Sequence, residues 1–271
     1  MRDSKGDSVK TLPADRHLVI GLGSGRSGTA SLSSLIDRQD GGICFHEMNP
    51  SCAAFSGNPQ SHVNVVREFR QLLLGGDRSW LSIDYSRPAS VATYERLQTL
   101  PEVRLIGDIA YYYLNYVKEI LEAVPECRFI CIKRDREETV ASWLTKSSIR
   151  RWPSLWLADR LKSAITRTPF YTSYNYWQEH DGSIWKLDPM WDSSFPKLQA
   201  ATKTEAVRLY WDYYYLEADR LQREYPENFQ VFDITELSNA EGQRRILSFI
   251  DIDPRRMVYG DDVHLHKSAG S

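Results

Sequence analysis

Residues 17–32, which read HLVIGLGSGRSGTASL, constrain the fold more than any other segment. An apolar run enters a loop that contains Gly23, Gly25 and Gly28, and a helix-like segment begins at Thr29. Glycines allow a tight turn in which several N–H groups converge, and the start of a helix adds its positive end. The segment therefore predicts a strand, an anion-binding loop and a helix.

The loop resembles a P-loop, G-x-x-x-x-G-K-[ST], but it lacks the lysine. Thr29 and Ala30 stand where that motif requires Lys and then Ser or Thr. The positive charge lies instead at Arg26, inside the loop, and Thr29 or Ser31 would have to supply the hydroxyl that holds magnesium. We interpret the loop as a phosphate site, with a purely structural turn as the alternative.

Two segments resemble the donor site of sulfotransferases that use 3′-phosphoadenosine 5′-phosphosulfate (PAPS). The basic-Ser-Gly-Thr sequence of their 5′-phosphosulfate loop is matched by residues 26–29, and residues 127–144 read as a strand followed by a helix. In that family the second strand ends in an Arg that holds the 3′-phosphate, and a Ser eight positions later contacts the same phosphate. Arg134 and Ser142 have this spacing, and a guanidinium with a hydroxyl suits a phosphate.

The resemblance implies that PAPS is the donor and adenosine 3′,5′-bisphosphate the product, with no metal. The donor-binding residues it implies are Gly25, Arg26, Ser27, Gly28, Thr29, Ala30, Arg134 and Ser142. Ala30 departs from the family, which often has a hydroxyl residue after the loop Thr. The C-terminal residues 264–271 match the family's basic, glycine-rich loop poorly, and we assign no aromatic residue that stacks on adenine.

Sulfuryl transfer requires a group that accepts the proton of the acceptor, and Arg26 would stabilise charge on the leaving oxygen. His46 and Glu47 follow an apolar run, and ligands gather beyond the carboxyl ends of parallel strands. Many sulfotransferases use a glutamate at the corresponding place, so Glu47 is our first candidate for the base and His46 the second. Asp84 and Asp108 also follow apolar runs and remain alternatives.

Apolar segments alternate with helix-like segments, which predicts an α/β fold with a central, mainly parallel sheet flanked by helices. We expect strands at 18–22, 43–46, 80–85, 103–107, 128–133 and 229–233, and helices at 29–38, 62–74, 88–99, 111–123, 136–148, 204–224 and 239–250. Residues 150–203 are aromatic and irregular. There we expect an insertion, helical in part, that forms an acceptor pocket or lid; the alternative is that these aromatic residues only cover the sheet.

The chain has 271 residues, 42% of them hydrophobic, which is enough for one domain over residues 16–271 after a flexible segment, 1–15. The net charge of −2 provides no global field for nucleic acid or an anionic membrane. The four cysteines show no metal-ligand spacing, and no apolar run is long enough for a signal or a membrane span. We expect a cytoplasmic protein with neither kind of partner.

The sequence therefore predicts a PAPS-dependent sulfotransferase that modifies a hydroxyl or amine of a small molecule, such as a natural product or a sugar. One alternative is a P-loop kinase or NTPase, in which Asp233 would bind the metal. A second is an inactive nucleotide-binding protein with the same fold. The acceptor and the oligomeric state remain open.

Overall fold

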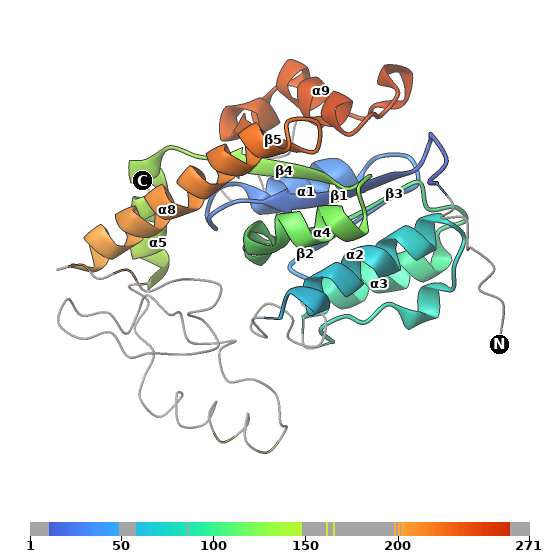
Figure 1. The fold of residues 1–271 in the computed structure, drawn as a ribbon, viewed down its shortest axis with the longest axis horizontal. Helices are drawn as coiled ribbons and strands as arrows, with labels where there is room; N and C mark the ends of the chain where they lie inside the picture. Colours follow the sequence, from blue (N-terminus) through green and yellow to red (C-terminus); the bar gives the residue numbers. More distant parts are fainter. Residues whose placement is uncertain are drawn as a thin grey trace, which may run out of the picture.

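The computed structural model describes residues 11–48, 58–85, 87–147 and 202–260, together with residues 161, 165, 198 and 200. Its centre is a parallel five-stranded sheet in the order β2-β3-β1-β4-β5 (Figure 1). The strands are β1 (His17–Leu22), β2 (Gly42–His46), β3 (Leu105–Ile109), β4 (Arg128–Lys133) and β5 (Phe229–Asp233). The three inner strands are short and almost wholly buried, as expected for parallel strands that are covered on both faces.

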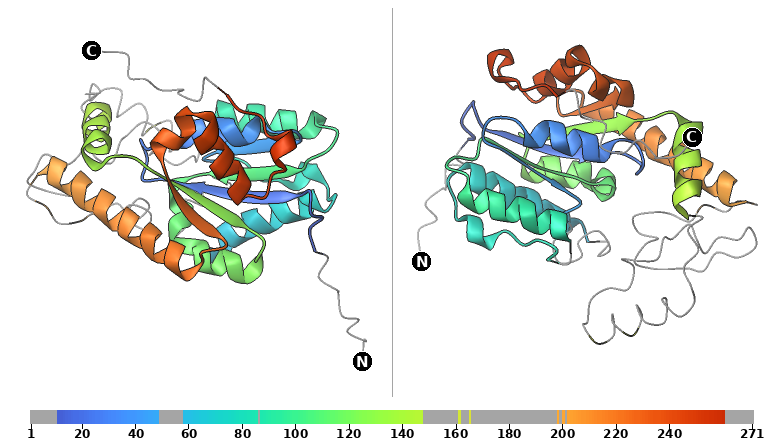
Figure 2. Two further views of the ribbon diagram at one scale, coloured as in Figure 1. Left: turned by 90° about the horizontal axis from the view of Figure 1, so that it is seen from above. Right: turned by 180° about the vertical axis from the view of Figure 1, so that it is seen from behind.

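Helices cover both faces of the sheet (Figures 1 and 2). One face packs against α1 (Thr29–Asp37) and α9 (Ala240–Phe249), and the other against α2 (Pro59–Leu73), α4 (Val117–Ala123) and α8 (Lys203–Glu224). Alternate β1 residues enter these two cores, since Val19 joins the first and Leu18 and Ile20 join the second. Two further helices, α3 (Pro88–Thr99) and α5 (Arg136–Ser147), pack against β2 and α8 respectively.

The predicted α/β class with its mainly parallel sheet is confirmed, and most helices begin and end within a few residues of their expected bounds. Asn58 starts α2 three residues earlier than expected, because its side chain accepts a hydrogen bond from the N–H of Gln60 and Pro59 follows. The expected helix at 111–123 begins as a 3₁₀ segment, Tyr111–Tyr116, before α4. The other short 3₁₀ segments are Arg78–Trp80, Ile234–Ser238 and Pro254–Arg256.

One expected strand was wrong. Residues 80–85 show the alternation of a strand, since Leu81 and Ile83 are buried and Ser82 is exposed, but they do not join the sheet. Residue 80 ends a 3₁₀ turn, and Asp84 lies in the turn before α3, where its carbonyl accepts from the N–H of Arg87. The alternation here reflects two side chains packed into the core. The other strand error is a shift, because 103–107 was expected where β3 runs from 105 to 109.

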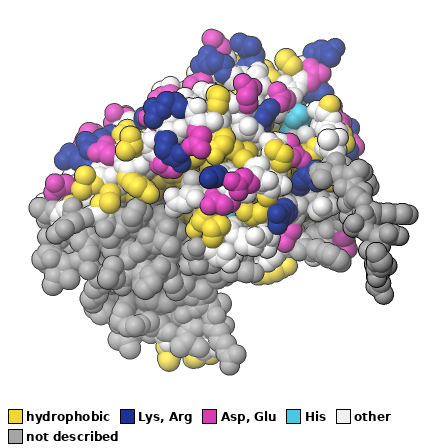
Figure 3. Space-filling view, in the orientation of Figure 1, with side chains coloured by type: hydrophobic (Ala, Val, Ile, Leu, Met, Phe, Trp, Pro, Cys, Tyr) yellow, Lys and Arg dark blue, Asp and Glu magenta, His cyan; other side chains and the backbone are white. Residues whose placement is uncertain are grey.

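Residues 1–10, most of the predicted insertion at 150–203, and residues 261–271 lie outside the described residues. Residues 11–16 end in a turn that leads into β1, where the N–H of Arg16 donates to the carbonyl of Pro13. In the described part of the chain, no helix has the length and apolar character needed to cross a membrane. On the face shown in Figure 3, basic and acidic side chains alternate across the described surface.

Candidate functional site

The loop after β1 turns sharply and leaves its backbone N–H groups available. Gly25, Arg26 and Gly28 all have positive φ, at 75°, 58° and 93°, and Gly28 precedes α1 without any side-chain cap. None of the N–H groups of residues 25–29 has an acceptor within the described ranges. A helix start with uncapped N–H groups and no acidic residue in its first turn favours an anion there.

Tyrosines of α8 hold the first part of this loop. The Tyr214 hydroxyl accepts from the N–H of Gly23 at 3.0 Å and donates to the carbonyl of Tyr111 at 3.1 Å. The hydroxyl of Tyr215 donates to the carbonyl of Ile132 at 2.8 Å and lies 3.3 Å from the Ser24 hydroxyl. The Tyr215 hydroxyl therefore ties the loop to β4, and the Tyr214 hydroxyl ties it to the 3₁₀ segment that follows β3.

The structure brings the two predicted donor motifs together. Nε of Arg26 donates to Oγ of Ser142 at 3.0 Å, although the two residues are 116 positions apart. Nη1 of Arg134 donates to the carbonyl of Arg26 at 3.2 Å, and its Nε donates to Glu138 at 3.0 Å. Two guanidinium groups and a hydroxyl therefore lie beside the loop.

The Arg26 guanidinium is half-buried and has no ion-pair partner among the described residues. Its one side-chain hydrogen bond there is the bond to Ser142. Burial lowers the pKa of its guanidinium, and the charge of nearby Arg134 lowers it further. Arg134 has only one acidic partner in the described ranges, Glu138 one helical turn away and 62% exposed. An anion between these arginines would offset both the desolvation and the repulsion.

The other predicted loop residues have different roles. A Cβ on Gly25 would lie 2.6 Å from the indole ring of Trp143, so glycine allows α5 to pack on the loop. Ser27 is buried, and its hydroxyl lies over Gly23, where an added Cβ would be 2.2 Å from it. Ala30 is the second residue of α1, and its methyl group supplies no polar contact there.

The first base candidates lie at the end of β2. Nε2 of His46 is 3.1 Å from the hydroxyl of Thr29, the first residue of α1, which places this imidazole at the loop. Glu47 has a left-handed backbone with φ 55°, and its carboxylate accepts from Nη2 of Arg87 at 2.7 Å. β2 is two strands from β1, so these residues lie about 10 Å across the sheet from the start of the loop. Sequence reasoning missed Arg87, because no motif links it to Glu47.

Asp108 is enclosed and has a structural role in the described contacts. Its Oδ1 accepts from the N–H of Met48 at 3.1 Å, and its Oδ2 accepts from the hydroxyls of Tyr112 and Tyr113 at 3.2 and 2.9 Å. Burial raises the pKa of Asp108 to about 6, even though these three hydrogen bonds oppose the shift. By holding Met48, Asp108 fixes the backbone next to Glu47.

The carboxylates that could bind a metal ion, as in a P-loop enzyme, already accept hydrogen bonds from the protein. The Asp233 carboxylate accepts from the N–H of Thr235 at 2.8 Å and caps the 3₁₀ segment after β5, at the edge of the sheet. Asp108 lies on β3, beside β1, but both of its oxygens already accept hydrogen bonds. Over the described ranges, no group of three or more His, Cys, Asp or Glu side chains is arranged to hold a metal ion.

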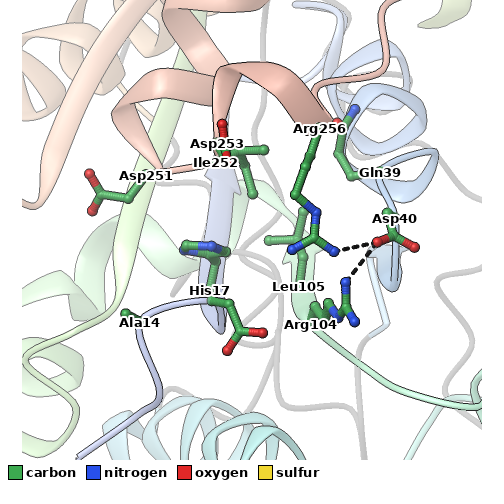
Figure 4. Close-up of a pocket in the computed structure, with 11 residues that line it drawn as sticks. Ala14, His17, Gln39, Asp40, Arg104, Leu105, Asp251, Ile252, Asp253 and Arg256 are labelled. Carbon is green, nitrogen blue, oxygen red and sulfur yellow. Dashed lines mark hydrogen bonds and ion pairs between the residues drawn. The ribbon is translucent and has the colours of Figure 1, made fainter.

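A cavity of about 240 Å³ lies at the end of the sheet where β1 and β3 begin, opposite to the glycine-rich loop (Figure 4). His17 and Leu105, which begin β1 and β3, line it together with Asp40, Arg104 and Arg256. Both arginines bind the same oxygen of Asp40, at 2.8 and 2.6 Å. The cavity is therefore separate from the loop, and its basic side chains already have an acidic partner.

No family model matches this chain, and no curated protein matches it. Among solved structures, the chain is similar to a sulfotransferase from Alicyclobacillus acidocaldarius, with 16% sequence identity and a TM-score of 0.42. The match covers 94% of this chain and 87% of the other.

Proposed function

We propose that the protein is a PAPS-dependent sulfotransferase that acts on a hydroxyl or amine of a small-molecule acceptor. The observation that carries this proposal is the meeting of Arg26, Ser142 and Arg134 at the glycine-rich loop. Separate segments with the sulfotransferase motif spacing converge there, and Arg26 lacks an acidic partner among the described residues. The site thus has the donors and the positive charge that a phosphorylated or sulfated ligand requires.

In this proposal the residues of the loop bind and polarise the donor. The N–H groups of residues 25–29 and the Arg26 guanidinium hold the 5′-phosphosulfate, while Arg134 and Ser142 hold the 3′-phosphate. PAPS would supply an activated sulfuryl group, whose transfer forms an S–O or S–N bond to the acceptor and breaks the S–O bond to the 5′-phosphate. Arg26 stabilises the charge that develops on that phosphate oxygen.

Glu47 or His46 takes the proton that the acceptor loses. His46 lies against Thr29 at the loop, whereas Glu47 lies one residue further along and is bound by Arg87. Because the Arg87 guanidinium holds its carboxylate, Glu47 can take the acceptor proton only when that ion pair is altered. The turnover rates of Glu47→Gln and His46→Asn distinguish the two candidates. Substitution of the residue that acts as the base should lower the rate by roughly two to four orders of magnitude.

Nucleotide binding tests the donor site. We expect adenosine 3′,5′-bisphosphate to bind without metal and about 10- to 100-fold more tightly than AMP, because the 3′-phosphate adds charge-assisted hydrogen bonds. Arg134→Gln should remove most of this preference. Arg220→Gln, a change of an exposed arginine of α8, is the matched control and should retain it. Equal affinities for the two nucleotides, or tight binding that needs ATP and magnesium, would contradict the proposal.

Catalysis needs a separate test, because an inactive protein could bind the same nucleotide. The protein and PAPS are incubated with pools of small molecules, and mass spectrometry detects an added sulfate. Arg26→Ala should lower turnover of the best acceptor by on the order of a hundredfold or more, with a smaller loss of nucleotide affinity. Nucleotide binding without any turnover would support the inactive alternative.

A further inference from the structure

The backbone at Glu47 is fixed by hydrogen bonds, and its carboxylate pairs with Arg87. Its backbone has φ 55°, and its N–H donates to the carbonyl of Ile109 at 3.0 Å. The next N–H, that of Met48, donates to the buried carboxylate of Asp108. The side chain then pairs with Nη2 of Arg87 at 2.7 Å. Glu47 is therefore presented to Arg87 by a backbone that is itself fixed.

Arg87 can bind another anion at this position. It precedes α3, and its side chain is 35% exposed while that of Glu47 is 31% exposed, so solvent reaches the ion pair. Within the described ranges its guanidinium makes one hydrogen bond, from Nη2, and one ion pair, with Glu47, while the charge of the nearby Asp108 also stabilises it. A guanidinium can bind a carboxylate or sulfate through two parallel N–H groups. An incoming anion that uses both would compete with Glu47 for the Nη2 hydrogen bond of Arg87.

We infer that Arg87 binds an anionic group of the acceptor, a carboxylate or a sulfate, and that this group replaces Glu47 on the guanidinium. Once Arg87 releases it, the Glu47 carboxylate can take the acceptor proton. Recognition of the acceptor is thereby coupled to activation of the base. The step that concerns Glu47 rests on the proposed function; the anion site on Arg87 does not.

Binding of benzoate tests the anion site, with neutral benzamide as the control ligand. Measurements use the full chain, with and without saturating adenosine 3′,5′-bisphosphate, which would occupy the arginines of the loop. We expect Glu47→Gln to bind benzoate about tenfold more tightly than the wild type, because it removes the competing carboxylate. Arg87→Met should lose benzoate binding, and benzamide should not bind in an Arg87-dependent way.

Arg87→Lys keeps the charge without the planar fork, so it should bind benzoate more weakly than the wild type and serves if Arg87→Met does not fold. Circular dichroism of each variant checks the fold. The inference is overturned if Glu47→Gln binds benzoate no more tightly than the wild type, or if both Arg87 variants bind it as the wild type does. Absence of nucleotide binding would contradict the proposed function alone, since the benzoate measurements do not depend on the nucleotide.

Discussion

We expect Asp108→Asn to change how stability depends on pH. Asp108 is fully buried, and its three hydrogen-bond donors are the N–H of Met48 and the hydroxyls of Tyr112 and Tyr113. An asparagine retains an oxygen for Met48, and the two hydroxyls can turn to accept from its amide. The substitution thus preserves the shape of the side chain and its contacts, while it removes the buried ionisable carboxyl group.

The size of the effect follows from the raised pKa of Asp108. Burial raises the pKa of this carboxyl from 3.8 to about 6. The folded state therefore binds the proton more tightly than the unfolded state, so this stabilisation is complete below pH 3.8 and is lost as the pH rises through 6. A shift of this size corresponds to about 3 kcal/mol over the whole window, of which about 1 kcal/mol is lost between pH 5 and pH 7.

A second buried group, His62, acts in the opposite direction. Burial lowers the pKa of His62 from 6.5 to about 4, although the Asn58 carbonyl opposes the shift. Its contribution is complete above pH 6.5 and is lost as the pH falls towards 4. From pH 5 to pH 7 His62 thus adds about 2 kcal/mol, while Asp108 removes about 1 kcal/mol. Asp108→Asn lacks the loss that Asp108 causes, so between pH 5 and pH 7 its free energy of unfolding should rise by about 1 kcal/mol more than that of the wild type.

Urea unfolding at pH 5, 6 and 7 measures these free energies of unfolding. Asp15→Asn is the matched control, because Asp15 lies in the exposed turn before β1 with a side chain that is 52% exposed. The same change in free energy between pH 5 and pH 7 in Asp108→Asn and the wild type would contradict a raised pKa of Asp108. A loss of stability of the variant relative to the wild type as the pH rises would contradict it as well.

Three further substitutions test the fold and the loop. Gly107→Ala should lower the free energy of unfolding by about 3 kcal/mol or more, because the new Cβ would lie 2.3 Å from the carbonyl oxygen of Val19; an unchanged urea midpoint would contradict the packing of β3 on β1. Thr202→Ala removes the side-chain cap of α8 and should cost about 1 kcal/mol in the same assay, with no effect expected if the cap is not formed in solution. Arg26→Gly and Arg26→Ala both remove the guanidinium, but the Gly variant should be more stable by about 1 kcal/mol because φ is 58° there; equal stabilities would mean that this backbone is not strained.

Much of the fold could be predicted from the sequence because parallel strands in a covered sheet are short apolar runs. The runs that became β1, β2, β4 and β5 were found within one residue of their bounds. The segment at 80–85 failed because alternation reports which side chains are buried, not whether the backbone pairs with a neighbour. Leu81 and Ile83 have buried side chains, but their backbone does not pair with a strand of the sheet.

The candidate site could be predicted only in part. The loop and Arg134 carry motif spacing, which is a local signal, and Ser142 follows from it. Arg87 and Tyr215 carry no such signal, because their roles depend on contacts that the fold creates across 40 and 191 positions. Aromatic residues at helical spacing predict burial, but they do not show which hydroxyl reaches the loop. Contacts of this kind become visible only when the strand order is known.

Unusual backbone conformations occur at two positions of the candidate site. Three non-glycine residues in the described ranges have positive φ, and two of them are Arg26 in the loop and Glu47 after β2. A left-handed conformation costs a residue with a Cβ about 1–2 kcal/mol, so each position needs compensation from its surroundings. At Glu47, Asp108 provides this compensation by accepting a hydrogen bond from the N–H of Met48. The carboxylate of Asp108 must be buried for this contact, which is itself unfavourable. Such costs oppose stability, and they accumulate at the strand ends where Arg26 and Glu47 would meet donor and acceptor. That location favours a role in binding or chemistry over one in folding.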